Sequence, residues 1–239
     1  MKIPILMYHQ IDVPPPSGTP LRGLVVSPGS FARQMWLLKL LGFRGLSMRD
    51  LEPYTNGALQ GRVVGITFDD GYENTVLNAL PVLRKMEFTA TCYAVSNMIG
   101  ATNSWDAHLG IEEKPLMALK DWKIWRDSGM EVGSHTRSHP NLTTLSTADS
   151  HMEIVTSKQE LEQLLSCEVR HFCYPFGQFE KDHISTVKEA GYISATTTRR
   201  GLIHEGDDPY TLRRVMIASA TNMVQFALKV TTDYEDRRK

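Results

Sequence analysis

The sequence predicts an α/β fold, a distorted (β/α) barrel of about seven strands in a single domain spanning residues 1–239. Apolar, β-branched segments of strand length alternate with amphipathic segments of helix length along the chain. Several strand segments are apolar throughout, as strands covered on both faces are. About seven or eight such units fit a chain of this length as a closed or slightly opened barrel, with an open doubly wound sheet as the alternative.

The elements follow one another in a regular order. We expect strands at 3–8, 63–68, 88–95, 130–134, 169–174, 192–197 and 212–217, with a weaker one at 42–46. Between them we expect helices at 27–42, 73–86, 116–129, 146–165 and 180–191, and a last one from about 219. Ser27-Pro28 and Ser146 are good helix starts, Gly42 is a good stop, and Pro81 is expected to kink its helix. Segments 12–27 and 99–114 remain as long loops, and 230–239 as a frayed tail.

The composition is that of an ordinary globular protein. Hydrophobic residues make up 41% and charged residues 22%, and the formal net charge is −1. Neither a nucleic acid nor a membrane surface is expected as a partner. Three cysteines without disulfide spacing indicate a reducing compartment. The first apolar run is short and broken by Pro4, so we expect no signal peptide, no transmembrane segment and a cytoplasmic location.

Two adjacent carboxylates, Asp69 and Asp70, directly follow the expected strand 63–68, and Gly71 after them permits a sharp turn. Neighbouring residues of an extended chain point to opposite sides, so the two carboxylates can take different tasks. One can bind a metal while the other acts as a base. The structural alternative is a strand end followed by an ordinary Asp-Gly turn.

Two histidines, His135 and His139, follow the expected strand 130–134. At this spacing on one helical turn, both imidazoles share a face and can bind one cation. Together with one carboxylate they leave positions open for water and substrate, which is typical of a catalytic metal site. The alternative is a pair of solvated loop histidines.

Two further strands also end in polar or aromatic groups. The first expected strand ends on Tyr8-His9, and strand 169–174 leads into a turn that contains Pro175 and Gly177. In a (β/α) barrel the active site lies at the carboxyl ends of the strands. Suitable residues at four separate strand ends therefore predict an active site at that end of the barrel.

With these residues the sequence resembles the polysaccharide deacetylase family, the NodB-homology enzymes of carbohydrate esterase family 4. The resemblance rests on "TFDDG" at 67–71, "SHTRSH" at 134–139 and "YPFG" at 174–177, and it extends from about residue 3 to residue 217. The opening "PILMYHQI" and the turn "FCYPFG" point to the branch that contains the poly-N-acetylglucosamine deacetylases.

The resemblance implies a distorted (β/α) barrel and a divalent metal, usually zinc, with cobalt, nickel or manganese as alternatives. It implies a hydrolase that removes an N-acetyl group, less often an O-acetyl group, from an amino sugar of a polysaccharide or glycan precursor and releases acetate. By position, the residues that resemble the metal ligands are Asp70, His135 and His139. Asp69 resembles the general base, the backbone at Phe176 resembles the oxyanion donor, and Tyr174 joins Phe176 among the substrate-binding residues.

Two departures from the family pattern change the assignment of roles. Family members commonly have an arginine that tethers the base where this chain has Cys173, and a late Leu-x-His that supplies the general acid. His204 follows "GLI" but matches that late motif poorly. In the branch that this sequence resembles, the acid is the histidine of the first strand, here His9. For the arginine, the last expected strand offers Arg214, with Arg213 second, because the last strand of a barrel returns beside the first.

These assignments form one mechanistic hypothesis. Asp69 accepts a proton from the attacking water, and His9 donates a proton to the departing sugar nitrogen. Arg214 keeps Asp69 ionised, since a nearby cation lowers the pKa of a carboxylate by about 1–3 units. In the long loop, Trp105 and Asp106 are expected to line the sugar pocket, whereas His108 is expected to be solvated.

Two alternatives remain at this point. One is a carbohydrate-binding barrel that is catalytically impaired, for which Cys173 is the main argument. The other is a metal-dependent amidase acting on a non-sugar C–N bond. The sequence leaves the identity of the sugar, the choice among polymer, lipid-linked glycan and monosaccharide, and the oligomeric state open.

Overall fold

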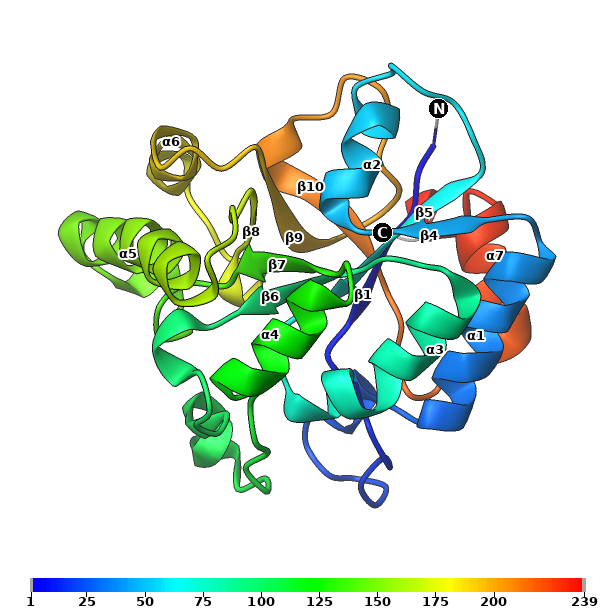
Figure 1. Cartoon of the computed structure of the whole chain (residues 1–239), viewed down its shortest axis with the longest axis horizontal. Helices are drawn as coiled ribbons and strands as arrows, with labels where there is room; N and C mark the ends of the chain where they lie inside the picture. Colours follow the sequence, from blue (N-terminus) through cyan, green and yellow to red (C-terminus); the bar gives the residue numbers. More distant parts are fainter. Residues whose placement is uncertain (1, 238–239) are drawn as a thin grey trace.

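The computed structural model describes residues 2–237, and these form the expected barrel with helices around it (Figure 1). Seven parallel strands follow the order β1-β10-β9-β8-β7-β6-β5, and pairing of β1 with β5 closes the ring. The strands of the ring are β1 (Ile5–Tyr8), β5 (Val63–Phe68), β6 (Thr91–Ala94), β7 (Glu131–Ser134), β8 (His171–Cys173), β9 (Ser194–Arg200) and β10 (Leu212–Met216). The predicted fold class, a single (β/α) barrel of about seven strands, is confirmed over the described residues.

The weaker expected strand is β4 (Arg44–Leu46), which lies outside the closed ring. It pairs with the first half of β5, at Val63 to Gly65, whereas β6 pairs with Thr67 and Phe68 in the second half. The two strands therefore share one edge of β5 in succession. A small separate sheet pairs β2 (Gln10–Ile11) with β3 (Val25–Val26). It fixes both ends of loop 12–27, which was expected to be irregular.

Helices cover the outside of the barrel. They are α1 (Pro28–Leu40), α2 (Met48–Thr55), α3 (Leu80–Met86), α4 (Leu119–Asp127), α5 (Thr147–Leu165), α6 (Lys181–Glu189), α7 (Met223–Thr231) and α8 (Tyr234–Arg237). The expected helix starts at Ser27 and Ser146 are confirmed, because each side chain accepts a hydrogen bond from a backbone N–H in the first turn. Helix α2 was not expected: it is short and contains Pro53, although Ser47 caps it in the same way.

The helix that contains Pro81 changes type just before the proline. A π-helical segment, η2 (Thr75–Ala79), precedes it, and α3 then begins at Leu80. Pro81 thus lies in the first turn of α3, where the missing N–H needs no partner within the helix. This position avoids the clash that a proline causes deep inside an α-helix.

The end of the chain is packed rather than frayed over its described part, 230–237. Glu235 in α8 is buried, and its carboxylate forms ion pairs with Arg200 at 2.6 Å and Lys229 at 2.6 Å. Two cations from β9 and α7 therefore anchor the last helix. Residues 238 and 239 of the expected tail lie outside the described residues.

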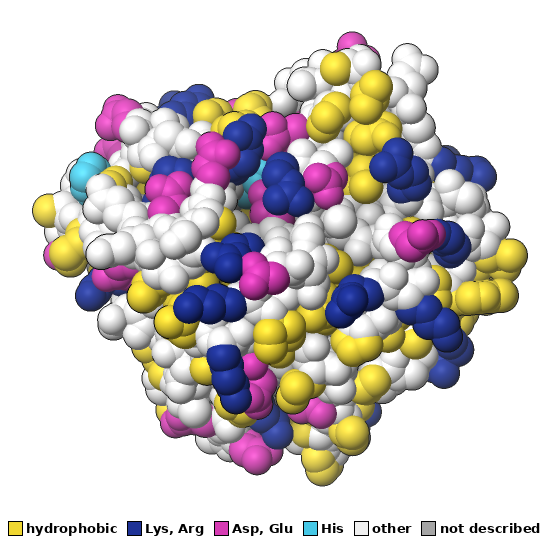
Figure 2. Space-filling model, in the orientation of Figure 1, with side chains coloured by type: hydrophobic (Ala, Val, Ile, Leu, Met, Phe, Trp, Pro, Cys, Tyr) yellow, Lys and Arg dark blue, Asp and Glu magenta, His cyan; other side chains and the backbone are white. Residues whose placement is uncertain are grey.

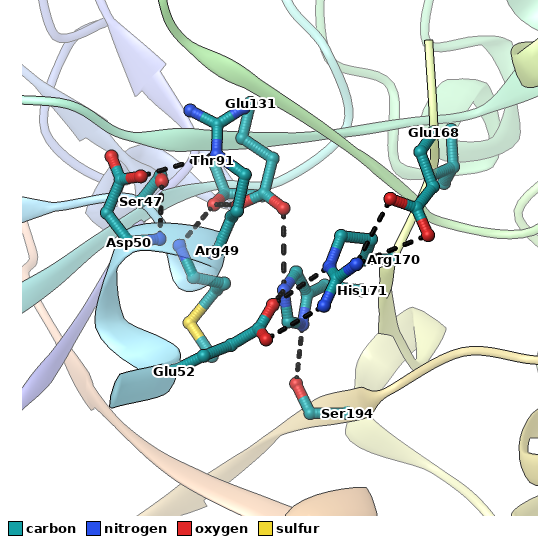
Figure 3. Close-up of polar contacts among 12 residues, drawn as sticks. Ser47, Arg49, Asp50, Glu52, Thr91, Glu131, Glu168, Arg170, His171 and Ser194 are labelled. Carbon is teal, nitrogen blue, oxygen red and sulfur yellow. Dashed lines mark hydrogen bonds and ion pairs between the residues drawn. The ribbon is translucent and has the colours of Figure 1, made fainter. Parts of the chain in front are cut away.

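A polar cluster lies at the amino end of the barrel, and His171, Glu131 and Ser194 in it are buried (Figure 3). His171 is the first residue of β8, and its Nε2 lies 3.2 Å from Glu52 and 3.4 Å from Glu131. Ser194 is 2.8 Å from the other ring nitrogen, and Arg170 binds Glu52 through two hydrogen bonds of 2.9 Å. These groups satisfy one another at the end of the barrel that contributes stability rather than catalysis.

The surface carries charges of both signs. On the face shown in Figure 2, lysines and arginines alternate with aspartates and glutamates, and no patch of one sign dominates it. Among residues 2–237, no helix has both the length and the apolar character needed to cross a membrane.

Candidate active site

The two adjacent aspartates at the end of β5 point to different partners. Asp70 has a φ of 73° and Gly71 a φ of 76°, so the chain turns sharply at the strand end. A Cβ at Gly71 would lie 2.7 Å from the Trp122 ring, which leaves glycine as the residue that fits without displacement. As a result, Asp69 faces the interior of the barrel and Asp70 faces the loop that follows β7.

Asp69 is held by Arg214, the arginine that we expected on the last strand. The guanidinium donates from Nη1 to Oδ1 and from Nη2 to Oδ2, both at 2.7 Å, and both side chains are buried. Arg214 is fixed in turn by Thr67 Oγ1 at 3.0 Å and the Thr197 carbonyl at 2.8 Å. Burial alone would raise the pKa of Asp69, but the charge and hydrogen bonds of Arg214 hold it below the usual range.

The second candidate, Arg213, points elsewhere and pairs with Asp207 at the surface. Residues on a strand alternate between its two faces, so only one of the adjacent arginines can reach the barrel interior. Cys173 lies beside the arginine that does: its Sγ is 3.2 Å from Nη2 of Arg214. The chain thus places an arginine on the base from β10, while position 173 on β8 carries a small buried thiol.

Asp70, His135 and His139 converge. Asp70 Oδ1 lies 3.4 Å from Nε2 of each histidine, and one ligand atom from each residue lies within 4.8 Å of the others. All three are buried. Burial alone would raise the pKa of Asp70, but hydrogen bonds from both imidazoles hold it well below its usual range.

The two histidines do not share a helical turn, so that part of the prediction was wrong. His135 follows β7 directly, and the chain then passes through Thr136 and His139 with φ values of 66° and 62°. Thr136 Oγ1 accepts a hydrogen bond from the His139 N–H at 3.1 Å. Glu153 of α5 accepts from the N–H groups of Arg137 and Ser138 at 2.8 and 2.9 Å, so this loop has a fixed path.

The donor set of this cluster fits a divalent metal. His135 Nδ1 is 2.7 Å from the Cys173 carbonyl, which directs Nε2 towards Asp70. Nδ1 of His139 is buried and has no hydrogen-bond partner among the described residues. One carboxylate and two imidazoles make three protein ligands, and a catalytic metal site keeps further positions open. A second possible group, Asp69 with His135 and Cys173, is less suitable because Arg214 already occupies both oxygens of Asp69.

His9 lies next to Asp69 in the same pocket. Its Nε2 is 3.8 Å from Asp69 Oδ2, and its side chain is 16% exposed, so solvent and substrate can reach it. Tyr8 faces the opposite way, is fully buried, and donates to Gln34 Oε1 at 2.9 Å. The alternation along β1 therefore separates a packing tyrosine from a histidine at the site.

A pocket of about 180 Å³ opens above these groups. Trp105 stacks on His139 with ring centroids 4.5 Å apart, and Phe176 meets the same ring edge-on at 4.8 Å. Asp106 is buried in the pocket wall, and burial followed by the charge of Asp70 raises the pKa of Asp106. Both members of the expected Trp105-Asp106 pair therefore lie at the site.

The turn after β8 contributes to the pocket in two different ways. Phe176 has a φ of 58° and is 51% exposed, so its ring and backbone reach the pocket. Tyr174 lines the pocket too, but it is buried, its ring stacks on Phe179, and its hydroxyl donates to the Tyr210 carbonyl at 3.2 Å. Tyr174 thus shapes the turn, while Phe176 faces the open space.

Several residues at the pocket were missed from the sequence. Leu21, Leu24 and Thr198 line the pocket without having been expected there, whereas His108 is exposed, as expected, and also lines the pocket. No sequence pattern marks the two leucines, which come from the loop after the first strand. His108 comes two residues after the expected Trp105-Asp106 pair, and its Nδ1 lies 3.0 Å from the Trp105 carbonyl.

Comparison with known proteins agrees with this geometry. The family model for polysaccharide deacetylase matches residues 56–195. YxkH of Bacillus subtilis is 29% identical over 219 residues, covering 91% of this chain and 72% of that protein. The poly-beta-1,6-N-acetyl-D-glucosamine N-deacetylase of Staphylococcus epidermidis is 24% identical over 203 residues, covering 83% and 70%. The Streptococcus pyogenes deacetylase PplD, solved in complex with acetate, has a TM-score of 0.83 and 26% identity, covering 96% and 98%. This chain belongs to the polysaccharide deacetylase family.

Proposed function

We propose that this protein is a metal-dependent hydrolase that removes the N-acetyl group from an acetylated amino sugar of a polysaccharide or glycan precursor. The observation that carries the proposal is the position of Asp69. Its carboxylate is held by Arg214, lies 3.8 Å from His9, and stands beside the cluster of Asp70 and two histidines in one pocket.

Asp70, His135 and His139 would hold the metal, with zinc as the first candidate and cobalt, nickel or manganese as alternatives. A divalent metal at this position supplies Lewis acidity and activates water near neutral pH. The buried carboxylate and the two imidazoles are already oriented by the Cys173 carbonyl and by the loop around Thr136, so little reorganisation is needed on binding.

The other residues of the pocket are assigned to proton transfer, oxyanion stabilisation and sugar binding. Asp69 is kept ionised by Arg214 and accepts the proton of the attacking water as general base. His9, on the opposite side, donates a proton to the sugar nitrogen as the C–N bond breaks, since an amine leaves poorly unless it is protonated. We assign stabilisation of the developing oxyanion to the backbone N–H of Phe176, whose turn lies at the pocket, and binding of the sugar to Trp105 and Asp106 of the pocket wall.

The test is acetate release from acetylated sugars after metal reconstitution, with variants that separate the roles. Asp70→Asn, His135→Ala and His139→Ala are expected to lose metal by elemental analysis. Asp69→Asn is expected to keep the metal and lose turnover. If none of the sugars releases acetate while the protein still binds metal and glycan, the impaired carbohydrate-binding barrel is favoured. Faster hydrolysis of non-sugar amides would favour the amidase.

A further inference from the structure

A second pocket, of about 330 Å³, opens beside the active-site pocket, and Leu21 lines both. We name it the proline pocket. It lies between the loop after the first strand and the end of the loop that carries Trp105. Its apolar wall is formed by Val13, Pro14, Pro15, Leu21, Val25 and Ile111.

The two pockets meet at Leu21, which lines both. His9 lines the active-site pocket, and Gln10, the next residue, lines the proline pocket. Neighbouring residues of an extended chain face opposite ways, so the contact between the pockets is made by Leu21, and a sugar beside His9 reaches the proline pocket past Leu21. The second pocket is thus placed to bind what is attached to the reacting sugar.

The wall of the proline pocket is braced. Arg22 donates from Nε to the Pro15 carbonyl at 2.8 Å and from Nη1 to Ser219 Oγ at 3.4 Å. The Asp12 N–H donates to the Val26 carbonyl at 3.0 Å, next to the pairing of β2 with β3. Proline residues also have a fixed φ, so the wall loses little freedom when a ligand binds.

Leu21 stands at the junction in an uncommon conformation. Its φ is 56°, in the left-handed region that a bulky side chain rarely adopts, and its side chain is 40% exposed. Strained residues of this kind persist where the surrounding structure holds them, and they concentrate at ligand sites. The conformation of Leu21 therefore holds its side chain at the junction of the two pockets.

The chemistry of the wall favours an aliphatic ligand. Eight of the thirteen residues that line the pocket are apolar. Four of the five polar ones already have one partner: Gln10 accepts from Asn74 at 3.2 Å, Asp12 accepts from the next backbone N–H at 2.7 Å, and Lys114 donates to Glu112 at 2.8 Å. A sugar ring placed here would face mainly apolar side chains, which offer its hydroxyl groups no hydrogen bonds. A hydrocarbon chain has no such requirement and gains from burial.

We propose that the proline pocket binds an aliphatic aglycone, so that the preferred substrate class is an amphiphilic glycoside of an N-acetylated amino sugar. This inference rests on the proposed deacetylase function. Leu21 then acts as a specificity-determining residue, because it separates the reacting sugar from its aglycone. Burial of one methylene group changes affinity about fourfold, so two or three buried groups give at least about a tenfold preference.

The experiment compares the hexyl and methyl glycosides of N-acetylglucosamine, below the micelle concentration, on the metal-loaded protein. We expect kcat/KM for the hexyl glycoside to exceed that for the methyl glycoside by about tenfold or more. Leu21→Asn tolerates the left-handed backbone but removes the aliphatic wall, and it should reduce this ratio to below about threefold. Ile111→Asn, from the opposite loop, should reduce the ratio as well. Val224→Asn, which replaces an exposed aliphatic residue of α7, is the matched control and should leave the ratio unchanged.

Equal kcat/KM values for the two glycosides in the unmodified protein would overturn the inference. A preference for N-acetylglucosamine oligosaccharides over the hexyl glycoside that depends on Leu21 would also overturn it and assign the pocket to a second sugar. If no glycoside releases acetate, the proposed function fails, and calorimetry still tests the pocket: about tenfold tighter binding of the hexyl glycoside supports it, and equal binding overturns it.

Discussion

Replacing Arg214 by methionine is expected to affect both stability and catalysis. The substitution removes two charge-assisted hydrogen bonds of 2.7 Å and leaves the Asp69 carboxylate buried without its cation. Loss of one member of a buried ion pair costs about 3–5 kcal/mol. Since a domain has a total stability of about 5–15 kcal/mol, a large fall in the denaturant midpoint and in Tm should follow.

The same substitution is expected to change the pKa of Asp69. With Arg214 absent, burial becomes the dominant influence, so the pKa of Asp69 rises instead of lying below its usual range. The acid limb of the kcat/KM profile should therefore move to higher pH. Arg214→Lys keeps a positive charge but cannot form the two-point contact. The acid limb of its kcat/KM profile should therefore lie between that of the unmodified protein and that of Arg214→Met.

The loss of stability in Arg214→Met should depend on pH. A carboxylate whose pKa is lowered on folding stabilises the protein above its unfolded pKa, about 3.9 for aspartate, and loses that contribution as the pH falls through the folded value. The difference between the unmodified protein and Arg214→Met should therefore shrink in acid. Arg213→Met is the control: its partly exposed pair with Asp207 is worth about 0–1 kcal/mol. An unchanged pH profile and midpoint for Arg214→Met would refute the reasoning.

Three further predictions follow from other parts of the structure. His9→Ala should retain metal and lower kcat/KM by about 10²–10⁴-fold, whereas Tyr8→Phe should leave kcat/KM unchanged and cost about 1 kcal/mol, because only Gln34 loses a partner. The pKa of Glu52 is about 2, lowered by its hydrogen bond to His171, so stability should fall as the pH drops from about 4.5 towards that value. This loss, about 1 kcal/mol after solvent screening, should be absent in Glu52→Gln. Removal of the metal with a chelator should lower Tm, and the loss should be reversed by zinc.

Each of these has a clear contrary result. Acetate release at the unmodified rate by His9→Ala would remove that residue from the mechanism. A stability curve for Glu52→Gln that falls in acid as steeply as that of the unmodified protein would assign the transition to other carboxylates. A Tm that does not respond to chelator or zinc, measured with metal content in parallel, would contradict metal binding by the Asp70 cluster.

The strand ends could be predicted from the sequence because each depends on a few neighbouring residues. An apolar run that stops at Asp69-Asp70 or before His135 is visible without knowledge of the fold. Helix α2 could not be predicted because it is short and interrupted by Pro53, and it is stabilised by packing against the barrel. The path between the two histidines was also missed, since it depends on Glu153 from a separate helix.

The sequence by itself determined the barrel and which residue types end its strands, because hydrophobic periodicity and turn residues act locally. It also limited the arginine to two adjacent candidates. Only the tertiary structure decided between them: closure of the ring pairs β10 with β1, and side-chain alternation directs Arg214 inward to Asp69 and Arg213 outward to Asp207. The proline pocket likewise depends on the approach of two loops far apart in the chain, a contact that no local pattern records.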